Sequence, residues 1–220
     1  MADNFLSTVS TATISQRQNV AHALRESIIS GDLAPGTQLK QNDISAKFNC
    51  SPGPVREAMR DLESEGLLEH YPNRGVFVSR ISNREFLEML APTRLVLEKF
   101  ALRDSVEKFT PIVIADLEEQ IEIMKQGAKR KDSKVIHEAD IRFHSITMEL
   151  AATPQTLQLW KSVMSRIRLE FYRVGASPTL ASQATHHKRL LEVLLSGDKK
   201  AIDRELEWHI IDTVVARLKK

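Results

Sequence analysis

The hydrophobic positions divide the chain into two regions of different periodicity. From residue 83 onward, apolar residues recur at the three- and four-residue spacing of an α-helix, with no strand-like alternation. Clusters of Pro, Gly and polar residues interrupt this helical pattern, and each cluster predicts a break between helices. The breaks fall near residues 110–111, 130–133, 153–154, 175–178 and 196–198. Residues 83–220 are therefore predicted to form an all-α bundle of about six helices.

The first region changes period several times within 80 residues. Helical spacing is followed by a Pro35-Gly36 turn, by two further short helices and then by two strand-like runs. The predicted helices span residues 15–30, 41–48 and 51–66, and the predicted strands span residues 67–70 and 76–79. Residues 1–14 are polar and aperiodic, and we expect a mobile arm there. The fold class is therefore mainly α, with an N-terminal winged helix-turn-helix at residues 15–80.

The third predicted helix has one apolar face and one face that carries two arginines. Ser51 is placed as its N-cap and Pro52 as its first helical residue. The inward positions are Val55, Ala58, Met59 and Leu62. The outward positions are Gly53, Arg56, Glu57 and Arg60. Because Arg56 and Arg60 are four residues apart, both guanidinium groups project from one side, where they can contact guanine edges or phosphates in the major groove.

The predicted hairpin adds a second possible DNA contact. Arg74 and Gly75 lie at its tip, where a cation can meet the DNA and glycine permits a close backbone approach. The alternative for the helix is a solvated face, on which both arginines pair with the neighbouring carboxylates of Glu57, Asp61 and Glu63. The sequence of elements around the helix favours the DNA-binding interpretation.

Composition and charge limit the function classes. The 220-residue chain has a formal net charge of +2, and its first 80 residues hold eight basic and nine acidic side chains. Nucleic-acid binding therefore depends on where the positive charges lie rather than on their number. Cys50 is the only cysteine, which excludes an internal disulfide and fits the reducing cytoplasm. No apolar run approaches the roughly 18 residues that span a bilayer, and no secretory signal pattern is present, so we expect no membrane association.

Four potential metal ligands lie on the apolar faces of three predicted helices. Asp140 and His144 are four residues apart, about 40° on a helical wheel, on or beside one apolar stripe. His187 lies among leucines in the helix predicted at residues 179–196, and His209 shares the apolar face of the last helix. A carboxylate and imidazoles gathered in this way can bind one metal ion. The histidines without such a placement are His22, His70 and His137.

The alternative for each ligand histidine is a hydrogen-bonded core residue, because a buried imidazole needs partners for its polar atoms. Three predicted helices each place a possible metal ligand on a largely apolar face, and this agreement favours the metal site over three separate core histidines. Three neutral imidazoles and one carboxylate suit a borderline divalent ion, with zinc expected first and nickel, cobalt or manganese as the other choices.

Several motifs of the first region occur in a characteristic order. They are Leu33-x-Pro35-Gly36-Thr37-x-Leu39, Ile44-x-x-x-Phe48, Ser51-x-x-Pro54-Val55-Arg56-Glu57-Ala58, Glu65-Gly66-Leu67 and Arg74-Gly75-x-Phe77-Val78. This order resembles the DNA-binding domain of the GntR family, which implies binding to double-stranded operator DNA. The resemblance implies these DNA-binding residues: Ser51, Gly53, Arg56, Arg60, Arg74 and Gly75. Members of the family often have an arginine directly after the serine, whereas this chain has Pro52, so the resemblance does not reveal the operator sequence.

The second region carries a further set of motifs. They are Arg94-x-x-Leu97-Glu98, Asp140-x-x-Phe143-His144, His187-x-x-Leu190-Leu191-Glu192-x-Leu194 and His209. These motifs are similar to the FCD domain, the C-terminal domain of the FadR-type GntR subfamily. The resemblance implies an all-α bundle that holds a divalent metal ion, with a pocket above it for a small organic-acid effector. The implied metal ligands are Asp140, His144, His187 and His209, and Arg94 is expected to help bind the effector.

The sequence therefore predicts a ligand-responsive transcriptional regulator that binds a roughly palindromic operator as a homodimer. Effector binding would favour one arrangement of the two DNA-binding heads over another. One alternative is a metal-dependent hydrolase, in which Glu138 or Glu205 could serve as the base beside the metal. Another is an architectural DNA-binding protein with a purely structural helical core. A winged helix has no use in a hydrolase, so the N-terminal region favours the regulator.

Overall fold

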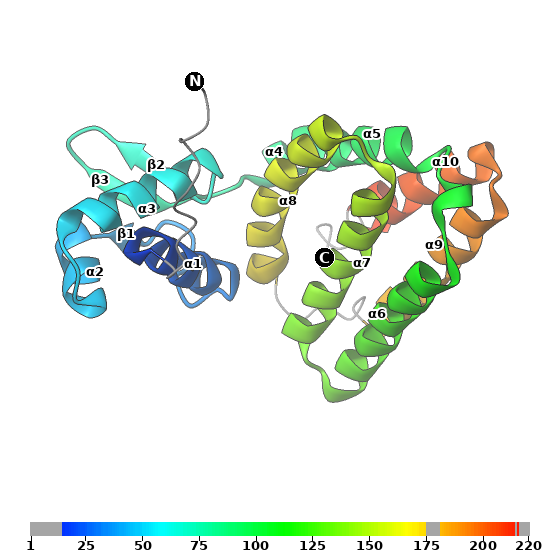
Figure 1. Cartoon of the computed structure of the whole chain (residues 1–220), viewed down its shortest axis with the longest axis horizontal. Helices are drawn as coiled ribbons and strands as arrows, with labels where there is room; N and C mark the ends of the chain where they lie inside the picture. Colours follow the sequence, from blue (N-terminus) through cyan, green and yellow to red (C-terminus); the bar gives the residue numbers. More distant parts are fainter. Residues whose placement is uncertain (1–14, 175–180, 214, 216–220) are drawn as a thin grey trace, which may run out of the picture. The chain divides into compact units, whose positions relative to one another are not determined.

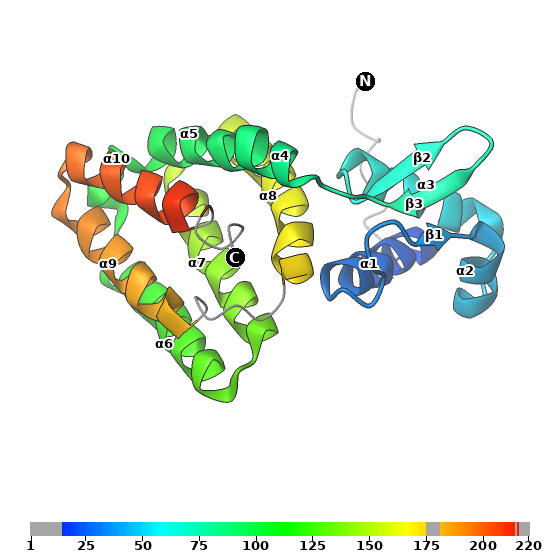
Figure 2. The same cartoon turned by 180° about the vertical axis from the view of Figure 1, so that it is seen from behind.

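The computed structural model describes residues 15–174, 181–213 and 215. The chain forms two compact units, Met1–Ser79 and Arg80–Lys220, which Figures 1 and 2 show from opposite sides. The arm predicted at residues 1–14 and the break predicted at 175–178 lie outside the described residues.

The first unit is a winged helix-turn-helix (Figure 1). Its elements are α1 (Gln16–Ile29), β1 (Gln38–Leu39), α2 (Gln41–Phe48), α3 (Pro52–Ser64), β2 (Leu68–Tyr71) and β3 (Gly75–Val78). The strands form one antiparallel sheet in the order β1-β3-β2. The predicted helices and hairpin are present with small shifts of their ends. The pattern does not predict β1, because two residues are too few to show an alternation.

Side-chain pairing holds α1 against α3. A capping box at Ser15 begins α1 and satisfies backbone donors of its first turn. Further along α1, the guanidinium of Arg17 lies 2.6 Å from Asp61 of α3, and that of Arg25 lies 2.6 Å from Glu65. Both arginines use two nitrogens, so each pair is bidentate. This pairing sets which carboxylates remain near the outer face of α3.

The second unit is entirely helical in its described residues. Its elements are α4 (Asn83–Glu85), η1 (Phe86–Leu90), α5 (Ala91–Leu102), η2 (Val106–Lys108), α6 (Pro111–Arg130), α7 (Ser133–Ala151), α8 (Pro154–Val174), α9 (Gln183–Ser196), α10 (Lys199–Glu207) and η4 (Trp208–Asp212). Because α4, η1 and α5 are continuous, as are α10 and η4, the described residues contain the six long helices that the breaks predict. None of the described helices is both long and apolar enough to cross a membrane.

Two predicted helix ends in this unit need correction. The first helix ends at Leu102, before a short 3₁₀ turn, so the break is wider than the one predicted at residues 110–111. The helix predicted to begin at residue 179 begins as α9 at Gln183, and residues 179 and 180 lie outside the described part.

Helix α7 lies in the interior of the second unit, with α6 and α8 on either side of it (Figures 1 and 2). Ten of its side chains are buried, among them Ile136, Phe143 and Met148. A helix covered on most of its surface places polar residues in the interior as well. Asp140 and His144 belong to this buried set, so α7 supplies the centre of the candidate site.

Candidate metal centre and nucleic-acid interface

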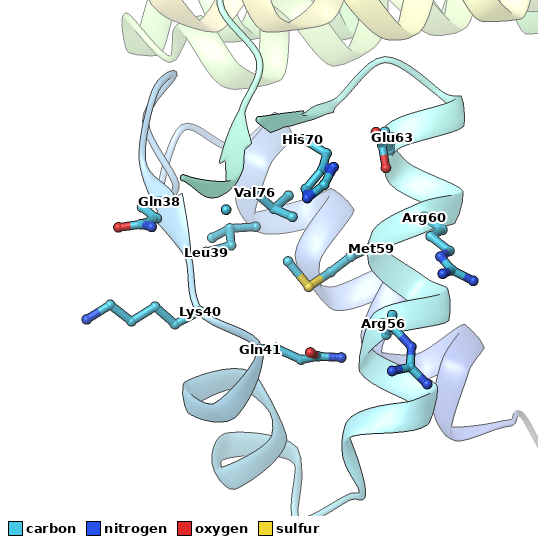
Figure 3. A pocket seen from close by; sticks show the side chains of 11 residues that line it. Gln38, Leu39, Lys40, Gln41, Arg56, Met59, Arg60, Glu63, His70 and Val76 are labelled. Carbon is cyan, nitrogen blue, oxygen red and sulfur yellow. The ribbon is translucent and has the colours of Figure 1, made fainter. Parts of the chain in front are cut away.

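The outer face of α3 borders a groove of about 470 Å³ between this helix and the strands (Figure 3). Arg56 and Arg60 leave the same side of α3, whereas Met59 points towards the strands. Lys40, at the start of α2, also lines the groove. The first unit therefore gathers three cations around one concave surface, although its overall charge is not positive.

One of the carboxylates that could neutralise Arg56 and Arg60 is engaged elsewhere, whereas Glu63 lines the same groove as the two arginines. Asp61, one of the partners considered from the sequence, is paired with Arg17 of α1. Neither Arg56 nor Arg60 forms an ion pair with another side chain that the structure describes, and both side chains are exposed. The first unit therefore leaves both arginines exposed, and a solvated face stays the alternative to a DNA-binding surface. Both guanidinium groups remain available to an anionic partner.

Ser51 and Gly53 form the start of α3. Ser51 occupies the N-cap position with an extended backbone, but its hydroxyl makes no capping hydrogen bond, contrary to the expectation for an N-cap serine. Pro52 at the first helical position presets the backbone there instead. A Cβ on Gly53 would meet no atom within 4 Å, so the backbone of this turn is open to an approaching ligand.

The wing is held in shape by its glycine. Gly75 has φ +101°, which other residues rarely adopt, and a Cβ there would lie 3.1 Å from Nε2 of Gln38. That nitrogen donates to the carbonyl oxygen of Arg74 at 2.8 Å, which ties the hairpin tip to β1. The Arg74 guanidinium lies 5.5 Å from the ring centre of Tyr71 and is exposed. The tip therefore presents a cation supported by an aromatic ring.

The second unit brings together the four side chains selected as metal ligands. Asp140 and His144 come from α7, His187 from α9 and His209 from η4. One potential ligand atom from each residue lies within 4.8 Å of the corresponding atoms of the others. All four residues are buried. The helical pattern thus identifies residues that the fold places in one cluster, across a separation of up to 69 positions in the chain.

Two of the imidazoles are oriented by hydrogen bonds of the ring nitrogen that faces away from the cluster. Nδ1 of His144 lies 3.0 Å from a carboxylate oxygen of Glu98, and Nδ1 of His187 lies 2.9 Å from the carbonyl oxygen of Gln183. An ionised carboxylate and a carbonyl only accept, so each Nδ1 carries the proton and donates it. In the neutral rings, both Nε2 atoms therefore present lone pairs to the cluster. This is the tautomer that a metal ligand requires.

Burial and the charges within the cluster favour an ionised Asp140 and neutral His144 and His209. Burial alone would raise the pKa of the Asp140 carboxyl, but the hydrogen bond and charge interaction with His187 hold that pKa well below its usual range. Burial lowers the pKa of His144. Burial and the neighbouring imidazoles lower the pKa of His209 well below its usual range. An ionised carboxylate beside neutral imidazoles is the donor set that a divalent metal binds.

The contacts inside the cluster fit the coordination of one cation. Nε2 of His187 lies 3.1 Å from Oδ1 of Asp140, and Nε2 of His144 lies 3.2 Å from Nε2 of His209. With a neutral His187 the first contact joins two acceptors, and with a proton on Nε2 it is an ion pair between His187 and Asp140. Protons on Nε2 of His187 and on Nε2 of His209 would satisfy the two contacts separately, and one metal ion would satisfy both together. Atoms that bind one zinc ion at about 2.0–2.1 Å lie roughly 3.0–3.4 Å apart, so these separations fit a metal.

Sequence reasoning missed three features of this site. His209 lies in a π-helical turn, a geometry that often marks functional sites and has no signature in the periodicity. His137 is buried with 4% of its surface exposed, contrary to its exclusion above. Its position seven residues before His144 puts it near the same face of α7, which could have revealed its burial. The third feature is Glu98, which sequence reasoning used only as part of a motif.

Arg94 lies in the interior near the cluster. Its guanidinium donates through Nε to Glu98 at 2.7 Å, and only 4% of its surface is exposed. Nη2 is buried and has no hydrogen-bond partner among the described residues. The Arg94 charge also acts on Asp140, His144 and His209. A buried cationic donor without a partner beside a metal-ligand cluster can bind an anionic group.

Two family profiles match the chain, one for each unit. The profile described as "Bacterial regulatory proteins, gntR family" matches residues 16–78, and the profile described as "FCD domain" matches residues 88–212. The chain belongs to the GntR family. This GntR regulator therefore combines a DNA-binding winged helix with an FCD domain.

Relatives and solved structures agree with this assignment. The GntR regulator is 28% identical to the HTH-type transcriptional repressor RspR of Escherichia coli K12 over 202 residues, 88% of this chain and 85% of RspR. It is 30% identical to the gluconate operon transcriptional repressor of Bacillus subtilis over 144 residues, 66% of this chain and 58% of that protein. A GntR-type regulator from Rhodococcus sp. RHA1 has a similar structure, with a TM-score of 0.79 and 28% identity, covering 93% of this chain and 98% of the other. Escherichia coli McbR/YncC shares the fold at 22% identity, also with a TM-score of 0.79, covering 94% of this chain and 98% of that protein.

The family is one of transcriptional regulators, and RspR and the gluconate operon relative are named as transcriptional repressors. The structure also gives no support to the hydrolase alternative. Glu138 is paired with Arg168, and Glu205 is paired with Arg189 at 2.6 Å, so both proposed bases are engaged in ion pairs. The family models and the relatives thus place the chain among transcriptional regulators and not among hydrolases.

Proposed function

We propose that this GntR regulator is a metal-containing, ligand-responsive member of the FadR-type subfamily. Residues 83–220 hold the metal and a small carboxylate effector, and residues 15–80 bind operator DNA in the bacterial cytoplasm. The observation that carries the proposal is the buried cluster of four ligand side chains, whose ligand atoms all lie within 4.8 Å of one another. One metal ion bound among these atoms would give all four buried side chains a partner at once.

The ligand set suits a borderline divalent ion, for which zinc remains the first expectation and nickel, cobalt and manganese the others. Oδ2 of Asp140 is buried and has no hydrogen-bond partner among the described residues. An ion in this site would polarise a carboxylate that approaches an open coordination position. Such an open position supports an effector site and distinguishes it from a closed structural metal site.

The effector is an organic acid held by Arg94 beside the metal. The unpartnered Nη2 of Arg94 can donate to a carboxylate, and its buried position makes this hydrogen bond strong. Relatives suggest which acids to test first. One relative is named for a gluconate operon, and an Escherichia coli relative, 23% identical over 213 residues, is named for a galactonate operon. Sugar acids therefore lead the set of probes.

We expect a thermal-shift screen of the zinc-loaded protein to find at least one small carboxylate, with gluconate and galactonate in the set, that raises the melting temperature. In Arg94→Ala, the affinity for that acid falls at least about tenfold because a charged hydrogen bond is lost. Arg94→Lys is the matched control, since it keeps the charge but loses the planar donors. Its affinity should fall between those of the other two proteins. An acid that binds all three equally well would exclude Arg94 from the effector site.

Operator binding calls for a homodimer, because two symmetric half-sites need two winged helices. The second unit exposes an apolar stripe that suits a second copy of the chain. Met89, Val96 and Phe100 lie on the side of the η1–α5 helix opposite the buried Arg94 and Glu98. Val96 is 65% exposed and Phe100 is 69% exposed. Two such stripes packed about a two-fold axis would cover each other, as in an isologous interface.

We expect the two candidate DNA contacts to behave differently on substitution. Arg56→Ala weakens operator binding by about 1–3 kcal/mol, because a base contact is lost, and leaves non-specific binding nearly unchanged. Arg74→Ala weakens operator and non-specific DNA alike and flattens the salt dependence, because its contact is to phosphate or the minor groove. Gel-shift titrations at two salt concentrations measure both effects. Unchanged operator affinity in Arg56→Ala would remove Arg56 from sequence readout, and a purely specific loss in Arg74→Ala would make the wing a base reader.

A further inference from the structure

Glu98 has three hydrogen-bond partners, on three different helical segments, and is completely buried. Its Oε1 accepts from Nε of Arg94 at 2.7 Å and from the indole nitrogen of Trp160 at 2.9 Å. Its Oε2 accepts from Nδ1 of His144 at 3.0 Å. Burial alone would raise the pKa of the Glu98 carboxyl, but Arg94 and His144 hold it at about 2. The side chain is therefore an ionised acceptor shared by α5, α7 and α8.

We propose that Glu98 is a positioning residue that couples the metal ligand His144 to Arg94 and to Trp160 of α8. This inference rests on the metal and effector sites of the proposed function. One carboxylate sets the tautomer of a metal ligand, orients the cation that meets the effector, and holds an indole in a neighbouring helix. Metal binding at His144, effector binding at Arg94 or a movement of the Trp160 indole therefore changes the hydrogen bonds that Glu98 makes with the other two residues.

The coupling follows from the chemistry of a shared carboxylate. When Nε2 of His144 binds a metal ion, the ring becomes a stronger donor at Nδ1 and draws carboxylate charge towards Oε2. Less charge then remains on Oε1, where Arg94 and Trp160 donate. The two bonds to Oε1 weaken together. Metal occupancy is thereby felt by the effector-binding cation and by α8.

Replacing Glu98 with glutamine keeps its shape but breaks this arrangement. An amide has one acceptor oxygen, and Arg94 and Trp160 both require it. The NH₂ group then faces Nδ1 of His144, which must accept, so the ring proton moves to Nε2. A protonated Nε2 cannot bind a metal ion. We expect Glu98→Gln to bind zinc about 10- to 100-fold more weakly, the usual cost of losing an outer carboxylate partner.

The matched control is Glu205→Gln. Glu205 is another buried glutamate of the same unit, 3% exposed, and it pairs with Arg189 at 2.6 Å. Among the described residues, no hydrogen bond or ion pair joins Glu205 to the four ligand residues. If loss of a buried ion pair were enough to weaken zinc binding, both variants would weaken it equally. Calorimetric titration of the full-length proteins with zinc separates the two.

Trp160 supplies a spectroscopic readout that a merely structural role would not move. The chain has two tryptophans, so Trp208→Phe leaves Trp160 as the only one. In that background, zinc should shift the Trp160 emission as its bond to Glu98 weakens, with a midpoint equal to the calorimetric one. The shift should disappear when Glu98→Gln is added, even at zinc concentrations that saturate the site. Because the first of these measurements keeps Glu98, it holds whether or not Glu98→Gln folds.

The outcomes separate this inference from the proposed function. No zinc binding by the wild-type protein would overturn the proposed metal site and the inference with it. Zinc binding with an unchanged Trp160 emission would overturn the coupling and leave the metal site intact. Equal zinc affinity in Glu98→Gln and the wild type, or an equal loss in Glu205→Gln, would do the same. Loss in Glu98→Gln alone, together with a zinc-dependent emission shift, supports the proposal.

Discussion

Chelation lowers the melting temperature of this GntR regulator, and His187→Ala removes that sensitivity. The four ligands join α7, α9 and the η4 turn, so an ion bound among them stabilises the folded unit by mass action. At free metal about 1,000-fold above Kd, the stabilisation is about 4 kcal/mol, or roughly 8–16 °C in a domain of this size. Thermal denaturation with and without a chelator, together with elemental analysis of the purified protein, measures the effect.

His186→Ala is the matched control for this experiment. His186 precedes His187 on α9, but its ring packs edge-on against Trp208 and is outside the ligand cluster. The chelator should therefore lower the melting temperature of His186→Ala as much as that of the wild type. Two histidine variants that respond alike would contradict the four-ligand site. So would a protein that contains no metal and takes none up, and the same residues would then be hydrogen-bonded core residues.

Phe100→Asp should separate the dimer and reduce operator affinity by about 100-fold or more. Phe100 is the most exposed member of the apolar stripe formed by Met89, Val96 and Phe100. A carboxylate at this position would face the same carboxylate of the second copy across an apolar interface. A monomer binds one half-site at a time. It therefore loses the increase in affinity that comes from joining two DNA-binding heads, which is typically 10²- to 10⁴-fold. Sedimentation velocity gives the oligomeric state, and gel-shift titration gives the affinity of the same preparation.

The control variant for the stripe is Ile112→Asp. Ile112 is 75% exposed at the start of α6, outside the stripe, so an acid there tests the effect of added negative charge alone. We expect it to remain dimeric with nearly unchanged operator affinity. A dimeric Phe100→Asp protein would exclude the stripe as the interface, and full operator affinity in a monomer would show that one winged helix is enough.

The local elements follow from the sequence because their causes are local. Helical spacing, proline and glycine breaks and the Pro52 start of α3 act over a few residues, and they predict both units and their helices. The two-residue strand β1 and the π-turn that carries His209 arise from long-range pairing and packing instead. The motifs are also local, because each spans only a few neighbouring residues. The comparisons confirmed their resemblance to the GntR and FCD families.

For the candidate site, the sequence by itself determined which residue types are available and on which helix faces they lie. It selected Asp140, His144, His187 and His209 because charged or polar groups on apolar faces need partners. Only the tertiary structure decided that these side chains converge and that Arg17 forms an ion pair with Asp61. It also decided that Glu98 accepts hydrogen bonds from three helical segments. Those relations depend on distances between residues far apart in the chain, and these distances are fixed by how the helices pack.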